Sequence, residues 1–167
     1  ARNIANNDIP IINDAWHGSL TAIKENSNET AIITSWWDFG HHFKSIADRP
    51  VTFDGTTQQT ERAHWVGRLF MTSNERETIG ILRMLDCGGN NAFDEVNKKY
   101  NDTVKSIALV KKMILLEKEE AKAALSEEDF NEEEAEAVLQ YTHCEEPEAF
   151  VIASEDMIGK SGVWAHF

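Results

Sequence analysis

Apolar side chains recur at helical spacing over most of the chain. Trp16, Leu20 and Ile23 follow Asn13, whose side chain suits an N-cap, and this pattern predicts a helix over residues 14–26. The same periodicity between polar or glycine-containing turns predicts further helices downstream. Five of these helices cover residues 40–47, 59–71, 75–85, 92–100 and 103–125. Two more follow: one begins at Ser126 with a capping box, and the last one is capped by Ser154.

Three short segments rich in β-branched and apolar residues predict strands. Residues 31–35 and 149–153 are apolar runs that favour buried strands, and residues 51–53 form a shorter candidate that ends in the Asp54-Gly55 turn. The expected fold class is α+β, predominantly α-helical, with about seven helices and a small sheet of short strands. If the first and last strands are neighbours, residues 36–38 and the start of the last helix project from the same edge of that sheet.

The charge of the chain limits its partners. It has 167 residues and a formal net charge of −13. Such a chain repels a phosphate backbone unless basic residues form a stripe, and none is present, so nucleic acid is not an expected partner. Residues 117–148 hold thirteen acidic residues and two lysines. Such a run is usually a solvated helix pair, and less often a docking surface or an adaptation to high salt or temperature.

The ends and the cysteines set further bounds. No stretch approaches the roughly 18 apolar residues of a membrane-spanning helix. The first residues show neither an initiator methionine nor the apolar core of a secretion signal, so we expect a part of something longer. Cys87 and Cys144 lie far apart and outside any CxxC pair, so metal binding through sulfur is not expected. One disulfide and two buried thiols remain open as alternatives.

Residues 36–38, Trp-Trp-Asp, are the densest chemical signal in the chain, and we call them the WWD segment. The two indoles of Trp36 and Trp37 supply N–H donors, and the carboxylate of Asp38 supplies acceptors. An alcohol offers one donor and two lone pairs, so these three side chains are able to satisfy one hydroxyl completely. The alternative is two packed core tryptophans beside a surface aspartate.

Other polar motifs carry less chemistry. His41 and His42 are adjacent, which on a helix sets them about 100° apart and suits one metal ligand rather than two. The remaining histidines show no ligand spacing, and no serine or cysteine lies in a nucleophile elbow, so a self-contained hydrolase is not indicated.

The string WWDFG at residues 36–40 resembles the WWDYG signature of the catalytic subunit of oligosaccharyltransferase, the membrane enzyme that moves a lipid-linked oligosaccharide onto asparagine. Gly-His-His at residues 40–42, Asp-Arg-Pro-Val at 48–51 and Asp-Gly-Thr-Thr-Gln at 54–58 agree with the C-terminal domain of that family. Phe39 replaces the usual tyrosine. The resemblance points to the archaeal branch in a short form, with residues 1–167 as a single soluble C-terminal domain of a larger multi-spanning membrane protein whose N-terminal transmembrane region is absent here.

The resemblance also implies roles for individual residues. It transfers to Trp36, Trp37 and Asp38 the binding of the Ser or Thr hydroxyl two positions after the acceptor asparagine. A second family element on a late helix reads DxxK or MxxI, and this chain has a mixed form at the same spacing. Its candidates for contact with the acceptor or its binding residues are Met157 and Lys160, followed by Asp156 and Trp164.

The remaining requirements of the family fall outside this chain. The resemblance implies a divalent metal, Mn²⁺ or Mg²⁺, and a pocket for the lipid-linked oligosaccharide, both in the N-terminal transmembrane domain. We therefore expect no catalytic residue, metal or cofactor in the chain itself, no activity of the chain alone, and a location at the extracytoplasmic face of the cell membrane. Its expected partners are an acceptor peptide with N-x-S/T and that transmembrane domain. The competing interpretation is an acidic helical protein-interaction module with no catalytic role.

Overall fold

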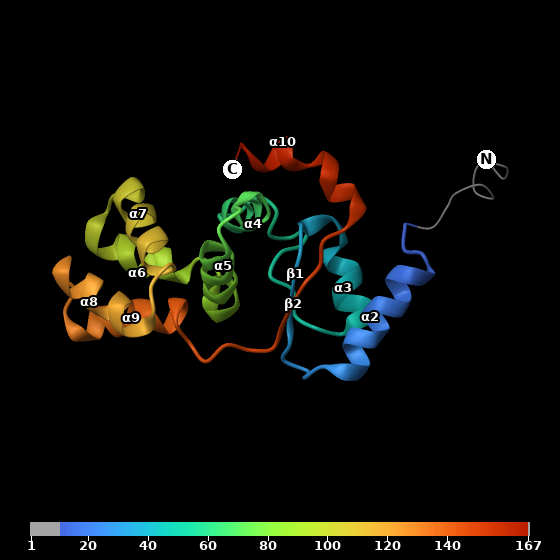
Figure 1. Cartoon of the computed structure of the whole chain (residues 1–167), viewed down its shortest axis with the longest axis horizontal. Helices are drawn as coiled ribbons and strands as arrows, with labels where there is room; N and C mark the ends of the chain where they lie inside the picture. Colours follow the sequence, from blue (N-terminus) through green and yellow to red (C-terminus); the bar gives the residue numbers. More distant parts are fainter. Residues whose placement is uncertain (1–10, 167) are drawn as a thin grey trace.

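The computed structural model describes residues 11–166, and the fold is α+β and mostly helical, as expected (Figure 1). The first part of the chain follows the sequence pattern closely. Helix α2 (Asp14–Asn26) begins where the Asn13 side chain accepts a hydrogen bond from the Trp16 amide. Strand β1 (Ile32–Thr34) then leads into a 3₁₀ turn, η1 (Trp37–Phe39), and helix α3 (Gly40–Ala47).

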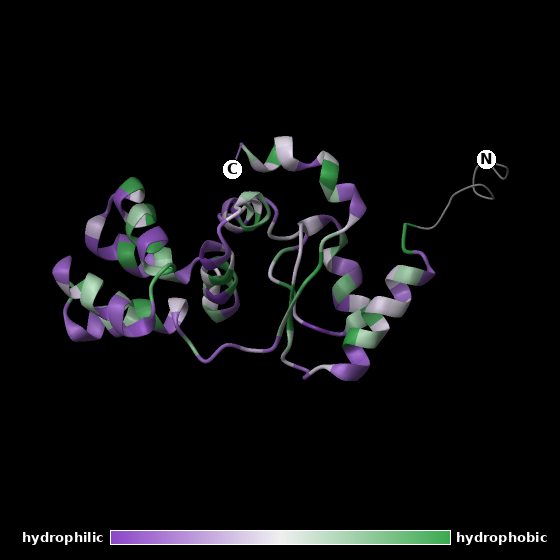
Figure 2. Ribbon diagram, in the orientation of Figure 1, coloured by the Kyte–Doolittle hydropathy of each residue, from purple (hydrophilic) through white to green (hydrophobic). Residues whose placement is uncertain are grey.

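The sheet consists of two parallel strands. Strand β2 (Ala149–Val151) pairs with β1 in a register that sets Ile33 beside Phe150, and Figure 2 colours both strands as apolar. The predicted strand over residues 51–53 is wrong in extent, because only Val51 forms an isolated bridge to Ile33. The Asp54 carboxylate accepts a hydrogen bond from the Thr56 amide, and this turn ends the extended segment.

The middle of the chain is helical. Helices α4 and α5 lie between the sheet and a group of four helices at the far end of the molecule (Figure 1). The bounds are α4 (Arg62–Met71), α5 (Glu75–Gly88), α6 (Asn91–Tyr100), α7 (Thr103–Met113), α8 (Lys118–Glu127) and α9 (Glu132–Thr142). The acidic segment supplies α8 and α9, which pack on each other and are joined by exposed Lys–Glu ion pairs.

The predicted single helix over residues 103–125 is wrong, because the chain bends between α7 and α8. The bend packs closely against helix α5. A Cβ atom at Gly80 of α5 would lie only 2.0 Å from the Ile114 carbonyl oxygen. Arg83 Nη2 also lies 3.3 Å from the Leu116 carbonyl oxygen and donates to it. Helix α8 then restarts with a capping box formed by Glu117 and Glu120.

The predicted helix start at Ser126 is also wrong. Ser126 belongs to the last turn of α8, and Asp129 adopts a left-handed conformation with φ 62°. The capping box of α9 lies further on, where Asn131 and Glu134 satisfy each other's backbone amides.

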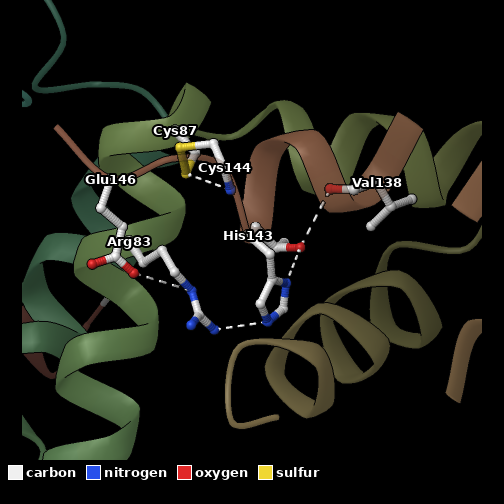
Figure 3. The surroundings of a disulfide bond; sticks show 7 residues. Arg83, Cys87, Val138, His143, Cys144 and Glu146 are labelled. Carbon is white, nitrogen blue, oxygen red and sulfur yellow. Dashed lines mark hydrogen bonds and ion pairs between the residues drawn. A yellow bond between two sulfur atoms is a disulfide. The ribbon is translucent and has the colours of Figure 1, made fainter. Parts of the chain in front are cut away.

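Cys87 and Cys144 form a disulfide, which decides between the two alternatives (Figure 3). The bond joins the end of α5 to the segment that leads from α9 to β2. Beside it, Arg83 Nη2 lies 2.8 Å from His143 Nε2. Burial lowers the pKa of His143, and the nearby positive charge of Arg83 lowers it further. The same Nε2 atom also lies 2.9 Å from the Leu116 carbonyl oxygen, and this contact opposes the lowering of the pKa.

The C-terminal part returns to the sheet region. The predicted last helix consists of a 3₁₀ segment, η2 (Glu155–Gly159), and a short helix, α10 (Ser161–Trp164), that packs on α4. Ser154 precedes η2 without making a side-chain cap. Buried side chains form two clusters, a large one under α4–α9 and α10 and a smaller one between the sheet, α2 and α3. No helix of the described residues is long and apolar enough to cross a membrane.

Candidate functional site

The WWD segment leaves the edge of the sheet with its side chains in different surroundings. Trp36 has an extended backbone and Trp37 starts the 3₁₀ turn, so the side chains do not alternate as in a strand. The Trp36 side chain belongs to the large core, where it is 3% exposed. Its ring packs edge-on against Phe53 at 5.1 Å between centroids and against Trp164 at 5.6 Å. Trp36 is therefore almost completely covered.

Trp37 and Asp38 lie nearer the surface. Trp37 is half-buried and packs on the large core from outside. The Asp38 side chain is 32% exposed, and its Oδ2 lies 3.0 Å from Lys160 Nζ. The structure thus brings the WWD segment and the late segment together, because β1 and β2 are parallel and both lead to the same edge of the sheet.

Lys160 holds two carboxylates. Its Nζ also lies 2.5 Å from Asp156 Oδ2, and the Ser154 hydroxyl donates to the other oxygen of Asp156. Burial opposes the charge of Lys160, but its hydrogen bonds to Asp156 and Asp38 outweigh that effect and raise the Lys160 pKa. Burial likewise opposes the charge of Asp156, and the bonds from Lys160 and Ser154 lower its pKa. Both shifts favour the charged forms of Lys160 and Asp156 at neutral pH.

Met157 and Trp164 lie on the inner side of the late segment. They are 6% and 7% exposed and belong to the large core. The Trp164 ring stacks on Phe70 at 5.3 Å, and its Nε1 is buried without a hydrogen-bond partner among the described residues. These two residues therefore form a buried apolar support beneath Lys160 and Trp36, and they do not form an open surface beside Asp38.

Asp54 lies behind the WWD segment, and the sequence pattern did not single it out because it reads there as part of a turn. Its side chain is 2% exposed and accepts hydrogen bonds from Lys44 and Thr56. Burial opposes its charge, but these bonds keep the Asp54 pKa well below its usual range. A Cβ atom at Gly40 would lie 2.5 Å from the Asp54 Cβ, so only glycine permits this close approach. Asp54 thereby fixes the start of α3 directly after the WWD segment.

Phe39, which follows the WWD segment, faces the smaller core. Its ring lies 5.1 Å from that of Trp16 on α2. His41 is exposed at 4.0 Å from Asp54, and His42 is half-buried. Between residues 11 and 166 no group of three or more His, Cys, Asp or Glu side chains is placed to hold a metal ion.

Comparison with known proteins gives a consistent picture. Residues 29–152 match the family model for the STT3/PglB/AglB core domain. The chain is 36% identical to a dolichyl-phosphooligosaccharide-protein glycotransferase of Methanocaldococcus jannaschii and 37% identical to one of Methanococcus voltae. Each comparison covers 95% of this chain and 18% of the relative, so the chain spans about a fifth of their length.

A eukaryotic relative is also similar over part of the chain. It is the dolichyl-diphosphooligosaccharide–protein glycosyltransferase subunit stt-3 of Caenorhabditis elegans, 32% identical over 81 residues, which are 48% of this chain and 11% of that protein. No solved structure matches the chain significantly.

Proposed function

This chain belongs to the STT3/PglB/AglB core-domain family, and on that premise we propose that it recognises the acceptor sequon N-x-S/T for an oligosaccharyltransferase. The complete enzyme would transfer a lipid-linked oligosaccharide to the asparagine of that sequon, as the names of the archaeal relatives suggest. Residues 1–167 would be its soluble C-terminal domain, attached to a multi-spanning region and located at the extracytoplasmic face of the membrane.

The proximity of Asp38 and Lys160 is the observation that carries the proposal. Lys160 contacts Oδ2 of Asp38 and so leaves Oδ1 of an oriented carboxylate to accept a hydrogen bond from the Ser or Thr hydroxyl. Trp37, half-buried beside it, would supply the indole N–H at the surface. Trp36 would support both from the large core.

Binding the hydroxyl serves to position the neighbouring asparagine. A held +2 residue fixes the acceptor amide near the reacting group and so lowers the entropic part of the barrier. An acceptor with alanine at +2 leaves the carboxylate and the indole unpaired, and sites built this way reject the missing hydroxyl by roughly 10⁴-fold. The domain thus contributes acceptor selection.

The chemistry of transfer would belong to the rest of the enzyme. The described residues do not fit the divalent metal that the family implies, because they form no metal-ligating cluster. We assign that metal, as Mn²⁺ or Mg²⁺, and the lipid-linked oligosaccharide to the transmembrane domain, and no step above passes through them. The isolated chain should accordingly transfer nothing.

The test uses the full-length enzyme and short peptides that differ only at +2. Asp38→Ala should lower the transfer rate to the Asn-x-Thr peptide by orders of magnitude. The variant should then transfer to Asn-x-Thr no faster than to Asn-x-Ala. Glu25→Ala is the matched control, since Glu25 is an exposed carboxylate on α2 outside the site. If Asp38→Ala keeps the preference for a hydroxyl at +2, the proposal is wrong.

A further inference from the structure

A groove next to the WWD segment has no role in the function proposed above. It lies between α2 and residues 152–155, which follow β2 and include the first residue of η2, and has a volume of about 360 Å³. Trp16 and Ile23 of α2 form one wall and Ile152 the other, while Ser154 and Glu155 form its polar rim. This volume is sufficient for one large aliphatic or aromatic side chain, since ligand pockets begin at roughly 300 Å³.

The lining of the groove is linked to the site on two sides. On one side the Trp16 ring packs against Phe39, which directly follows the WWD segment. On the other side a chain of polar contacts runs from Ser154 through Asp156 and Lys160 to Asp38. A peptide bound at Asp38 therefore reaches the groove within a few residues, at about 3.3 Å per extended residue.

We propose that the groove binds a large apolar side chain of the acceptor polypeptide, about three to five residues from the sequon hydroxyl. This proposal rests on the proposed function, because the same peptide would occupy both places. The apolar walls favour Leu, Ile, Phe or Trp. Lys160 is paired with both Asp38 and Asp156, and Glu155 adds a further carboxylate at the rim, so neutral or basic neighbours in the peptide are favoured over acidic ones.

The experiment uses the full-length enzyme and peptides with a fixed Asn-x-Thr. One leucine is placed in turn at each flanking position from three to five residues away, on both sides, and compared with serine at the same position. We expect one position at which leucine lowers KM by about tenfold, equivalent to about 1.4 kcal/mol and to burial of roughly half of the side chain. Equal KM values for leucine and serine at every position would overturn the proposal.

Variants of α2 place the effect in the groove. Ser19 lines the groove, and Ser19→Phe should fill it and remove the advantage of leucine over serine, whereas Ser19→Ala should keep it. His17→Phe adds the same ring at an exposed position of α2 outside the groove and should also keep the advantage. The ratio between two peptides is the measured quantity, so a partial loss of folded enzyme cancels. A leucine advantage that persists in Ser19→Phe contradicts the proposal.

The two proposals fail in different ways. If the enzyme discriminates Asn-x-Thr from Asn-x-Ala through Asp38 but shows no groove-dependent preference, only the groove assignment is wrong. If Asp38→Ala leaves that discrimination intact, hydroxyl binding by the WWD segment is wrong, whatever the flanking residues do.

Discussion

Removing the disulfide should cost this chain a large part of its stability. Cys87 and Cys144 are 57 positions apart, and the residues between them include the four helices α6–α9. In the chain-entropy model a loop of this length costs the unfolded state about 4 kcal/mol of free energy when it is closed. The total free energy of unfolding of a small domain is only about 5–15 kcal/mol. The double variant Cys87→Ala/Cys144→Ala should therefore remain folded at room temperature but lose roughly a quarter or more of its stability.

The measurement is urea unfolding of the purified chain, followed by far-ultraviolet circular dichroism, for the oxidised wild type and the double variant. A reductant should destabilise the wild type by a similar amount and leave the double variant unchanged, which controls for the loss of the Cys144 amide contact to Cys87 Sγ. A difference below about 1 kcal/mol would refute the reasoning, because it would mean that the unfolded chain keeps the two segments together without the bond.

Two further predictions concern charged groups. Lys160→Met leaves the carboxylates of Asp38 and Asp156 without their shared cation, so KM of the full-length enzyme for an Asn-x-Thr peptide should rise about ten- to a hundredfold. Lys160→Arg should show a smaller rise in KM. An unchanged KM in Lys160→Met would contradict the role given to Lys160. Burial and, to a smaller extent, the negative charge of Glu146 raise the pKa of Asp86 to about 7. The folded state therefore favours the protonated carboxyl group, so the contribution of Asp86 to stability is fully present below pH 3.8 and is lost as the pH rises through about 7. Asp86→Asn should thus be more stable than the wild type at pH 8, by roughly 4 kcal/mol at most, with the gain vanishing toward pH 4 in urea unfolding; a constant difference would contradict the assignment.

Local signals were sufficient for much of the fold. The cap at Asn13, the extent of α3 over residues 40–47 and the strands around Ile33 and Phe150 follow from side chains within a few positions of each element. These elements are short and their boundaries are marked by capping or turn residues, so tertiary contacts did not need to alter them.

The boundaries that failed depend on contacts from elsewhere in the chain. Residues 103–125 carry a continuous apolar face, and the break between α7 and α8 is fixed by Gly80 and Arg83 of α5, which no periodicity in that stretch reveals. In the acidic segment, several positions offer equivalent capping signals. The left-handed Asp129 decides that α9 begins after Asn131 rather than at Ser126.

In the candidate site, too, the local chemistry could be predicted and the effects of distant contacts could not. Counting donors and acceptors in the WWD segment identified a group able to bind a hydroxyl, and that count needs only side-chain chemistry. It treated Trp36 and Trp37 as equivalent. The difference between them arises from Phe53 and Trp164, which cover Trp36 and come from distant parts of the sequence. Burial is a property of the assembled core, so the local pattern could not provide it.

The meeting of Asp38 and Lys160 depends on the direction and register of one strand pair. Antiparallel strands would carry the two following segments to opposite ends of the sheet, whereas parallel pairing of β1 and β2 carries both to one end. Ser35 Oγ also donates to the Ile152 carbonyl, a bond between residues 117 positions apart that secures the register just where the strands stop. A slip by one residue would turn Phe150 away from the smaller core and reverse the faces of β2. The apolar side chains that pack against α2 and α3 therefore determine where the charged side chains beyond the strands can meet.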